Sequence, residues 1–384
     1  MTRMIRSILC ALALCGTAAA QSTWTVKFGG GPGVDFTDLP SAVAAAADGD
    51  TIIVQQGALG VGATSFTTSK GLTIVGEGGA VNIETQAWDP IIIQTLPVGS
   101  SFRMAGFSKA QEGGVNVRIL DCKGEVHLQD LEAREPWAFF TTSPSIEILR
   151  SDSVTLTDVR NFGAPAILVD QSVVSVVDCW LQIVPSTGLG GGAAIEATTS
   201  TIHIVQPHFS VDFGVQSSIT AVGCSLSITG DPTSLIHNTN GDLIFATGGQ
   251  IELDPAVTLS TGLGFSAFSG SAPVTTKALP ASWTSDVHPG QSMTLTTWAP
   301  PGSHVFQAIG QPGMLTTHPF GLLGIDITQG FFYLPTKVAP ASGVVQWTLP
   351  VPASLAAGSA FTTQALIATA ISVEIGKPCT FVAD

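Results

Sequence analysis

The hydrophobic pattern of the chain is a short strand-like unit that recurs between residues 72 and 247. Each copy carries bulky apolar residues at its first and third positions, often a polar residue at its second, and Asp, Gly, Gln or Thr at its fifth. This alternation predicts strands with one buried face that end at a turn residue. The copies are LTIVG, FRMAG, VHLQD, VTLTD and VSVVD, followed by the weaker IHIVQ, ITAVG and LIFAT.

The spacing of the copies indicates how the strands are arranged. They start at residues 72, 102, 126, 154, 174, 202, 219 and 243, so the repeat is irregular but stays near 17 to 30 residues. A second strand often precedes the first, as VNVRI precedes VHLQD. Repeats of this length, with two short strands in each, predict the coils of a parallel β-solenoid.

A short helix is predicted before the first coil. Asp38 can cap it, Pro40 lies in its first turn, its body is SAVAAAA, and Asp48-Gly49 stops it. The strand TIIV follows directly.

This N-terminal segment, DFTDLPSAVAAAADGDTIIV followed by GLTIVGEG, resembles the start of secreted bacterial proteins of the pectin-lyase-like superfamily. The resemblance covers roughly residues 24 to 250 and implies a right-handed parallel β-helix whose first coil is plugged by a short helix. It implies no particular activity, because the fold carries lyases, hydrolases, esterases, epimerases and inert adhesins. It also carries over no catalytic residue, because the sequence lacks the signature motifs of polygalacturonases, pectate lyases and pectin methylesterases.

The coil pattern stops after Pro255, and the composition of the chain then changes. A segment rich in Gly, Ser and Ala, predicted as a linker over residues 263–272, leads into short strands broken by Pro and Gly. These strands, SMTLTTW, HVFQAIG, LLGIDI, GFFYL, VVQWTLP, FTTQALI and ISVEIG, predict an antiparallel β-sandwich. We therefore predict an all-β chain: a right-handed parallel β-helix over residues 21–262 and a smaller sandwich over residues 273–384. Residues 343–375 also resemble a module appended to many large secreted bacterial proteins.

Residues 1–20 are predicted to be a secretory signal peptide. Arg3 and Arg6 precede the apolar run SILCALALCG, and Ala18 and Ala20 supply the small residues of a cleavage site before Gln21. The run is too short to span a bilayer. We therefore expect a secreted protein without a membrane span, acting outside the cell or at the cell surface.

The net charge of −14 limits the partners that the chain can bind. Nucleic acids and anionic membranes attract basic patches, so neither is expected as a partner. The same charge disfavours tight binding of polyanionic sugars unless a cation bridges them.

Four cysteines remain after the predicted signal peptide: Cys122, Cys179, Cys224 and Cys379. Cys179 and Cys224 each follow the fifth position of a copy, and the copy at residue 202 lies between theirs. Two coils would separate them by about 9 to 10 Å, which is beyond disulfide reach. We expect small buried thiols in an internal ladder, whereas a disulfide between these two would mean that the register is wrong.

Three aspartates occupy the same position in successive coils: Asp130, Asp158 and Asp178. Carboxylates about 5 Å apart repel one another unless a cation or backbone N–H groups compensate them. The resemblance adds that aspartates of adjacent coils bind Ca²⁺ in pectate lyases, so a Ca²⁺ site is one interpretation. The other is that each aspartate bonds the backbone of its own turn, which is the usual reason for Asp at a strand end.

The second position of each copy faces outward, and two of these residues could move a proton. Arg103 and His127 should lie one coil apart and near Asp130, and with Asp158 they are the candidate catalytic residues. His127 and His203 are about 14 Å apart in this register, so they cannot share one metal. An ordinary sheet surface would explain the same set, whose other members are Thr73, Thr155, Ser175 and Thr220.

Three tryptophans lie in or beside the turns between coils: Trp88, Trp137 and Trp180. Exposed Trp beside polar groups can hold sugar rings by stacking and hydrogen bonding, so these three are the candidate ligand-binding residues. Packing of the loops against the β-helix is the alternative explanation.

The chain contains no HExxH, GxSxG or CxxC motif and no phosphate-binding loop. The leading hypothesis is therefore a secreted non-catalytic protein that presents a binding face to a polysaccharide or a cell-surface component. The alternative is a polysaccharide lyase or glycoside hydrolase that acts at the three-aspartate face, with Arg103 or His127 moving a proton. A purely structural envelope component is the third hypothesis.

Overall fold

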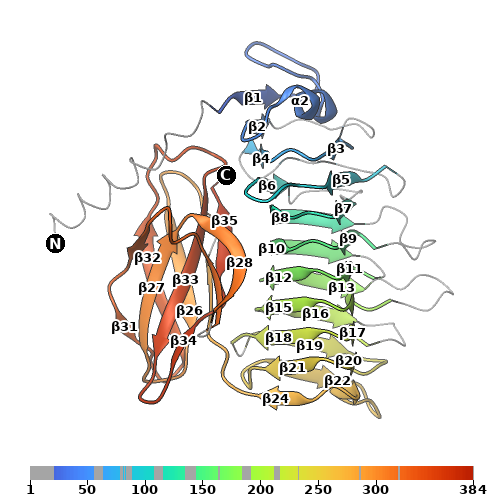
Figure 1. The fold of residues 1–384 in the computed structure, drawn as a ribbon, viewed down its shortest axis with the longest axis vertical. Coiled ribbons are helices and arrows are strands. Elements are labelled where there is room, and N and C mark those ends of the chain that lie inside the picture. Colours follow the sequence, from blue (N-terminus) through green and yellow to red (C-terminus); the bar gives the residue numbers. More distant parts are fainter. Residues whose placement is uncertain are drawn as a thin grey trace.

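The computed structural model describes residues 21–55, 64–77, 81, 83, 89–107, 116–134, 144–162, 165–183, 192–211, 217–231, 233–284, 287–318 and 321–383. These residues form a parallel β-helix followed by a smaller antiparallel domain, with one helix at the N-terminal end (Figure 1). The predicted all-β fold class is confirmed. The predicted signal peptide, residues 1–20, lies outside the described residues. Within the described ranges, no helix has the length and apolar character needed to cross a membrane.

One flank of the β-helix is a long parallel sheet, here called sheet A. Val154 is in register with Val126 and Val174 of the neighbouring coils, and all three side chains are at most 1% exposed. Burying each such side chain contributes about 1.5–3 kcal/mol relative to leaving it exposed. The strands are β1 (Thr23–Val26), β2 (Thr51–Val54), β4 (Thr73–Gly76), β6 (Ser101–Phe107), β8 (Glu125–Arg134), β10 (Ser153–Phe162), β12 (Val173–Val177), β15 (Thr201–Val205), β18 (Ser225–Thr229), β21 (Gln250–Leu253) and β24 (Val274–Thr276).

The same coils supply a second parallel sheet, sheet B. Its strands bury alternate residues, as in β9, where Ile146 and Ile148 face the core and Glu147 is partly exposed. They are β3 (Thr67–Thr68), β5 (Ile91–Gln94), β7 (Val117–Leu120), β9 (Ile146–Leu149), β11 (Ile167–Asp170), β14 (Ile195–Thr198), β17 (Ile219–Val222), β20 (Ile244–Thr247) and β23 (Phe268–Gly270). A third set continues from the C-terminal half of β10: β13 (Trp180–Ile183), β16 (His208–Val211), β19 (Leu235–Asn238) and β22 (Thr258–Thr261).

The structure corrects the predicted register of two weak copies. ITAVG and LIFAT, predicted to continue the series of VSVVD, form β17 and β20 of sheet B. The sheet A strands of those coils are β18 and β21. Strands of both sheets share the same apolar alternation, so the alternation alone does not tell which sheet a strand joins. Thr220, predicted in the same outward row as Arg103 and His127, therefore lies on sheet B.

The β-helix also extends beyond its predicted end at residue 262. β23 and β24 each pair with a strand of the preceding coil, so the coils continue to Thr276. β23 lies inside the segment predicted as a linker, residues 263–272. In a segment so rich in Gly and Ser, such short strands have too few apolar residues to show a periodic pattern.

The predicted N-terminal helix is confirmed as α2 (Leu39–Ala45). The Asp38 carboxylate accepts a hydrogen bond from Ser41 N at 2.8 Å, which satisfies one of the free N–H groups of the first turn. Leu39, Ala42 and Val43 of this helix are buried in the core of the β-helix. The helix therefore closes the N-terminal end of the coil stack (Figure 1).

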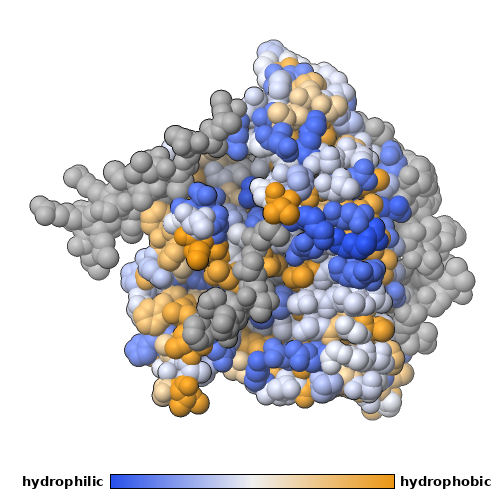
Figure 2. Space-filling view, in the orientation of Figure 1, coloured by the Kyte–Doolittle hydropathy of each residue, from blue (hydrophilic) through white to orange (hydrophobic). Residues whose placement is uncertain are grey.

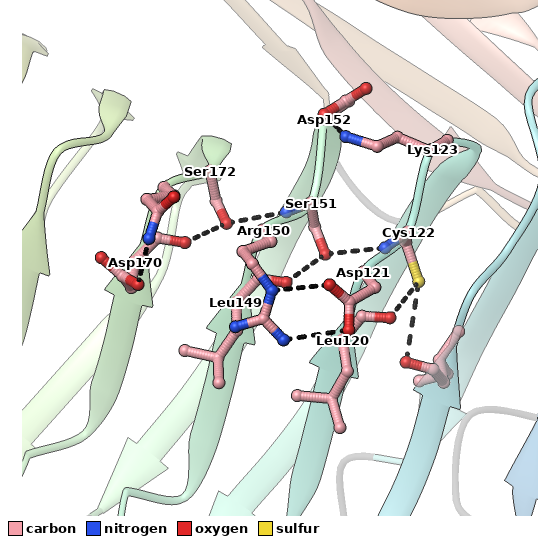
Figure 3. Close-up of polar contacts among 12 residues, drawn as sticks. Leu120, Asp121, Cys122, Lys123, Leu149, Arg150, Ser151, Asp152, Asp170 and Ser172 are labelled. Carbon is pink, nitrogen blue, oxygen red and sulfur yellow. Dashed lines mark hydrogen bonds and ion pairs between the residues drawn. The ribbon is translucent and has the colours of Figure 1, made fainter.

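In five successive coils, from β7 to β17, the chain turns at the end of the sheet B strand through a residue of positive φ followed by a small buried residue. Together, these buried residues form what is here called the turn ladder: Cys122, Ser151, Ser172, Ser200 and Cys224. Ser151 N donates to Ser172 Oγ at 3.0 Å, and Ser172 Oγ donates to the carbonyl of Asp170 at 2.7 Å (Figure 3). The ladder thus links each coil to the next and satisfies buried backbone groups.

The four cysteines of the described chain are free and buried, which confirms the expectation for Cys179 and Cys224. Their predicted placement is wrong, because Cys122 and Cys224 belong to the turn ladder whereas Cys179 follows β12 of sheet A. Burial raises the pKa of the Cys179 thiol well above its usual range, so this group stays protonated.

The C-terminal domain is a β-sandwich with its own core. Leu295 and Trp347 of the smaller sheet pack with Val305, Ile367 and Phe381 of the larger one. The smaller sheet consists of β25 (Ala281–Thr284), β26 (Ser292–Trp298) and β32 (Val344–Pro350). The larger consists of β27 (His304–Gly310), β28 (Pro312–His318), β29 (Gly321–Ile325), β30 (Phe331–Tyr333), β31 (Lys337–Val338), β33 (Ala360–Ala368), β34 (Val373–Ile375) and β35 (Cys379–Val382). The bounds of β26, β27 and β32 match the predicted strands.

The sandwich packs on the outer face of sheet A (Figure 1). The Gln129 amide donates to the Val382 carbonyl at 3.1 Å and accepts from Val382 N at 2.6 Å. Thr157 Oγ1 donates to the Thr380 carbonyl at 3.2 Å. Strand β35 therefore lies directly on β8 and β10, and the outward row of sheet A is covered rather than exposed.

Candidate functional site

The three aspartates at the fifth position of the sheet A repeats share a special backbone conformation: Asp130 and Asp158 lie within β8 and β10, and Asp178 follows β12. Asp130, Asp158 and Asp178 have φ values of 46°, 48° and 51°. The equivalent residues in flanking coils, Gly106 and Gln206, also have positive φ. Asp tolerates this left-handed region better than most residues, so part of its recurrence here is conformational.

Two of these aspartates line a cavity of about 200 Å³ between the β-helix and the sandwich, here called the junction cavity. Asp158 and Asp178 come from neighbouring coils, which places their backbones about 5 Å apart. The sandwich contributes the indole of Trp283. The remaining lining residues are Gln129, Thr157, Val177, Thr284 and Phe381. The cavity thus combines two carboxylates, amide and hydroxyl groups, and aromatic surface.

Asp178 lies between the cavity and a row of exposed side chains on the third set of strands. Its carboxylate lies 3.4 Å from His208 Nε2, and this hydrogen bond raises the pKa of His208. Asp178 keeps 42% of its side chain exposed, so the junction cavity reaches solvent on this side.

Trp180 is 53% exposed and stands in this row. It is in register with Arg160 on one side and His208 on the other, and its ring centroid lies 6.4 Å from that of His208. We call Arg160, Trp180 and His208 the aromatic row. Of the three tryptophans predicted to bind ligand, Trp180 is described and exposed, whereas Trp88 and Trp137 lie outside the described residues.

Arg103 and His127 face outward from sheet A, as predicted, but the sandwich covers them. They line a hollow of about 20 Å³ that the segment from Pro312 to Leu315 closes, and this volume holds about one water molecule. The Arg103 guanidinium lies 4.0 Å from the Glu125 carboxylate. These groups line a different hollow from Asp158 and Asp178.

His127 is only 3% exposed. Its Nε2 lies 3.2 Å from Gln129 Oε1, while Nδ1 is buried without a hydrogen-bond partner. Burial lowers the pKa of His127 to about 4, so its imidazole is neutral near pH 7. For His127 to move a proton, a substrate would have to reach beneath the sandwich.

Across the described ranges, no group of three or more His, Cys, Asp or Glu side chains is arranged to hold a metal ion. The Ca²⁺ site at Asp130, Asp158 and Asp178 stays a prediction. Of these three, Asp158 and Asp178 share the junction cavity, and Asp130 is not among its lining residues.

The residues that sequence reasoning missed come from the sandwich. Trp283 and Thr284 belong to β25, and Phe381 belongs to β35. No local pattern marks them, because their position beside the aspartates depends on the packing of two domains. Cys379 and Ala281, which share a small apolar cluster with Val177 next to the cavity, carry no local signal either.

The described residues define a parallel β-helix protein with a sandwich packed on one flank and an acidic, aromatic cavity between the two domains. No family model matches the chain, and no curated protein matches it significantly. Among solved structures, it is similar to the enzymatically active domain of tailspike protein 2 from bacteriophage CBA120. The two are 10% identical, the match covers 94% of this chain and 76% of that one, and the TM-score is 0.36. At that TM-score, the similarity supports no conclusion about the function of this chain.

Proposed function

We propose that this protein binds a carbohydrate, with one sugar unit in the junction cavity and neighbouring units along the aromatic row. The observation that carries the proposal is the composition of the cavity: Asp158 and Asp178 of the β-helix line it together with Trp283 of the sandwich. Carboxylates accept hydrogen bonds from sugar hydroxyls, and an indole offers an apolar face for the ring.

The size of the cavity fits a small ligand. Drug-sized ligands occupy pockets of about 300–1,000 Å³, so a cavity of about 200 Å³ suits a single sugar ring. A longer glycan would continue past Asp178 to Trp180, which is exposed on the adjacent strand. This arrangement favours an oligosaccharide over an isolated monosaccharide.

The charge of the site narrows the class of sugar. Two aspartates in a chain of net charge −14 repel uronic acids and sulfated sugars. We therefore propose neutral or amino sugars as ligands, at the cell surface or outside the cell, where the predicted signal peptide would direct the chain.

A second candidate function is glycoside hydrolysis. Neighbouring coils hold the backbones of Asp158 and Asp178 about 5 Å apart, so their side chains can reach the carboxyl separation of about 5–5.5 Å that retaining glycosidases use. A hydrolase is also favoured over a lyase that uses His127 to move the proton. His127 lies beneath the sandwich, away from the junction cavity.

The test is a binding screen against neutral, amino and acidic glycans with three variants. We expect Asp178→Asn and Trp283→Leu to weaken binding of the best glycan at least tenfold, which is about 1.4 kcal/mol. The matched control is Asp152→Asn, which removes an exposed carboxylate from a sheet B turn. Equal affinity of all four proteins would refute the proposal.

The same samples separate binding from hydrolysis. With Asp158→Asn added to the set, release of new reducing ends by the wild type that both Asp158→Asn and Asp178→Asn abolish would establish the hydrolase. Binding without product would leave a carbohydrate-binding protein.

A further inference from the structure

The C-terminal end of the β-helix is open. The last strands of the coil stack, β22, β23 and β24, each pair with one strand of the preceding coil and with none beyond it in the described residues. Figure 1 shows nothing placed beyond β24 and β22 at this end of the stack. Their outer backbone N–H and C=O groups are therefore free to pair with another chain.

The hydrophobic core is open at the same place. Phe268 and Val274 are in register with Ile244 and Ile251, which are 0% and 2% exposed. Phe268 is partly exposed, and Val274 is 40% exposed. In any earlier coil, the next coil would cover these positions. Among the residues that the structure describes, none caps the interior of the coil stack at this end.

The loop between β22 and β23 adds apolar surface to this end. Leu263 is fully exposed at 102%, and Phe265 is 42% exposed. At the other end, α2 buries Leu39 and Val43 over the first coil, so the two ends of the β-helix are not equivalent.

The open end is also almost free of charge, although the whole chain carries −14. Between residues 255 and 278 the sequence contains a single ionisable side chain, Lys277, which pairs with Glu252 at 2.7 Å. Electrostatic repulsion between two copies of this acidic chain is therefore weaker at this end than at a surface that carries unpaired carboxylates.

From these observations, we propose that the open end is the docking surface for a second copy of this chain, joined end to end across a two-fold axis. A two-fold contact uses the same surface on both copies, and this surface is apolar, uncharged and bounded by unpaired strand edges. Head-to-tail stacking does not fit, because α2 covers the other end. The chain itself leaves after Lys277 for the sandwich, which packs on sheet A.

Sedimentation velocity over a concentration series tests this proposal. The wild type should sediment as a dimer, and its dissociation constant should rise at least tenfold in Leu263→Asp and in Val274→Lys. Leu263 is fully exposed, so its substitution leaves the fold intact, and Val274→Lys places a charge on the strand edge itself. The matched control is Ile371→Asp, which changes a side chain of the sandwich that is 96% exposed.

Three results would overturn the proposal. The wild type could remain monomeric at every concentration, or it could form assemblies that keep growing beyond a dimer. A dimer that Ile371→Asp dissociates while Leu263→Asp does not would place the contact on the sandwich instead.

Discussion

Sheets A and B are built from the same kind of strand, but their outward polar side chains differ in solvent exposure. On sheet B and its turns, charges are exposed and paired across coils: Arg118 with Glu147 at 3.2 Å and Lys123 with Asp152 at 2.8 Å. On sheet A, the outward polar side chains are buried beneath the sandwich, and His127 and Ser175 are 3% and 1% exposed. Figure 2 shows hydrophilic colour over the middle coils of the β-helix and hydrophobic patches on the sandwich.

The difference shows that solvent exposure decides how much a polar side chain of the β-helix contributes to the free energy of unfolding. Exposed ion pairs are screened by water and contribute little to stability. Buried polar groups must be neutral or paired with an opposite charge, as Arg103 is with Glu125, and an unpaired one loses its bonds to water without replacement. Sheet A is therefore the flank at which a change of charge should matter most.

The largest effect expected is acid destabilisation through sheet A. Burial lowers the pKa of His127 from 6.5 to about 4, so below pH 6.5 the unfolded chain takes up a proton that the folded chain does not. Stability should therefore fall between about pH 6.5 and pH 4, and His127 alone contributes about 3 kcal/mol to that loss. Denaturant unfolding at a series of pH values measures it.

His127→Gln should flatten this pH dependence, and adding His203→Gln should flatten it further, because burial also lowers the pKa of His203. The control is His304→Gln, a substitution of an exposed histidine of the sandwich. An unchanged slope in the double variant would mean that sheet A is not the acid-sensitive flank.

A smaller effect is expected in the turn ladder of sheet B. Ser172→Ala removes the acceptor for Ser151 N and leaves that buried N–H unsatisfied, which costs about 1–3 kcal/mol of unfolding free energy. Ser172→Cys should cost less, because the ladder already contains Cys224, whose Sγ accepts from Ser200 N at 3.4 Å. Equal losses in the two variants would show that a thiol at position 172 does not replace the hydroxyl as the acceptor for Ser151 N.

The smallest effect on stability is expected from an exposed ion pair. Arg150 donates to both carboxylate oxygens of Asp121, at 2.6 and 2.9 Å (Figure 3). This contact holds the pKa of Asp121 below its usual value. Arg150→Ala should raise that pKa, measured by nuclear magnetic resonance, while unfolding by denaturant changes little. A large loss of stability would show that sheet B depends on its charges after all.

The sequence predicted those parts of the fold that depend on local pattern. Asp38 and Pro40 marked the capping helix, and the alternation of VTLTD marked a strand with a buried face. The pattern could not assign ITAVG to sheet B, because strands of both sheets bury alternate residues in the same way. It also could not locate the end of the coils, since β23 and β24 are three residues long.

The candidate site was predicted only in part. The aspartates and Trp180 lie in the repeat itself, so their stacking followed from the register of VTLTD and VSVVD. The cover over His127 and the indole of Trp283 depend on contacts between residues far apart in sequence, such as Gln129 and Val382. No spacing along the chain encodes such contacts.

Strand β35 has a consequence for the order of events during synthesis. Val382 N donates to the Gln129 side chain across 253 positions of the chain. The sandwich can therefore cover sheet A only after β35 has been synthesised. The coils can stack as they emerge, because each one needs only its neighbour. During that interval, His127 lacks the sandwich that covers it in the complete structure, so a step late in synthesis completes the burial of this side chain.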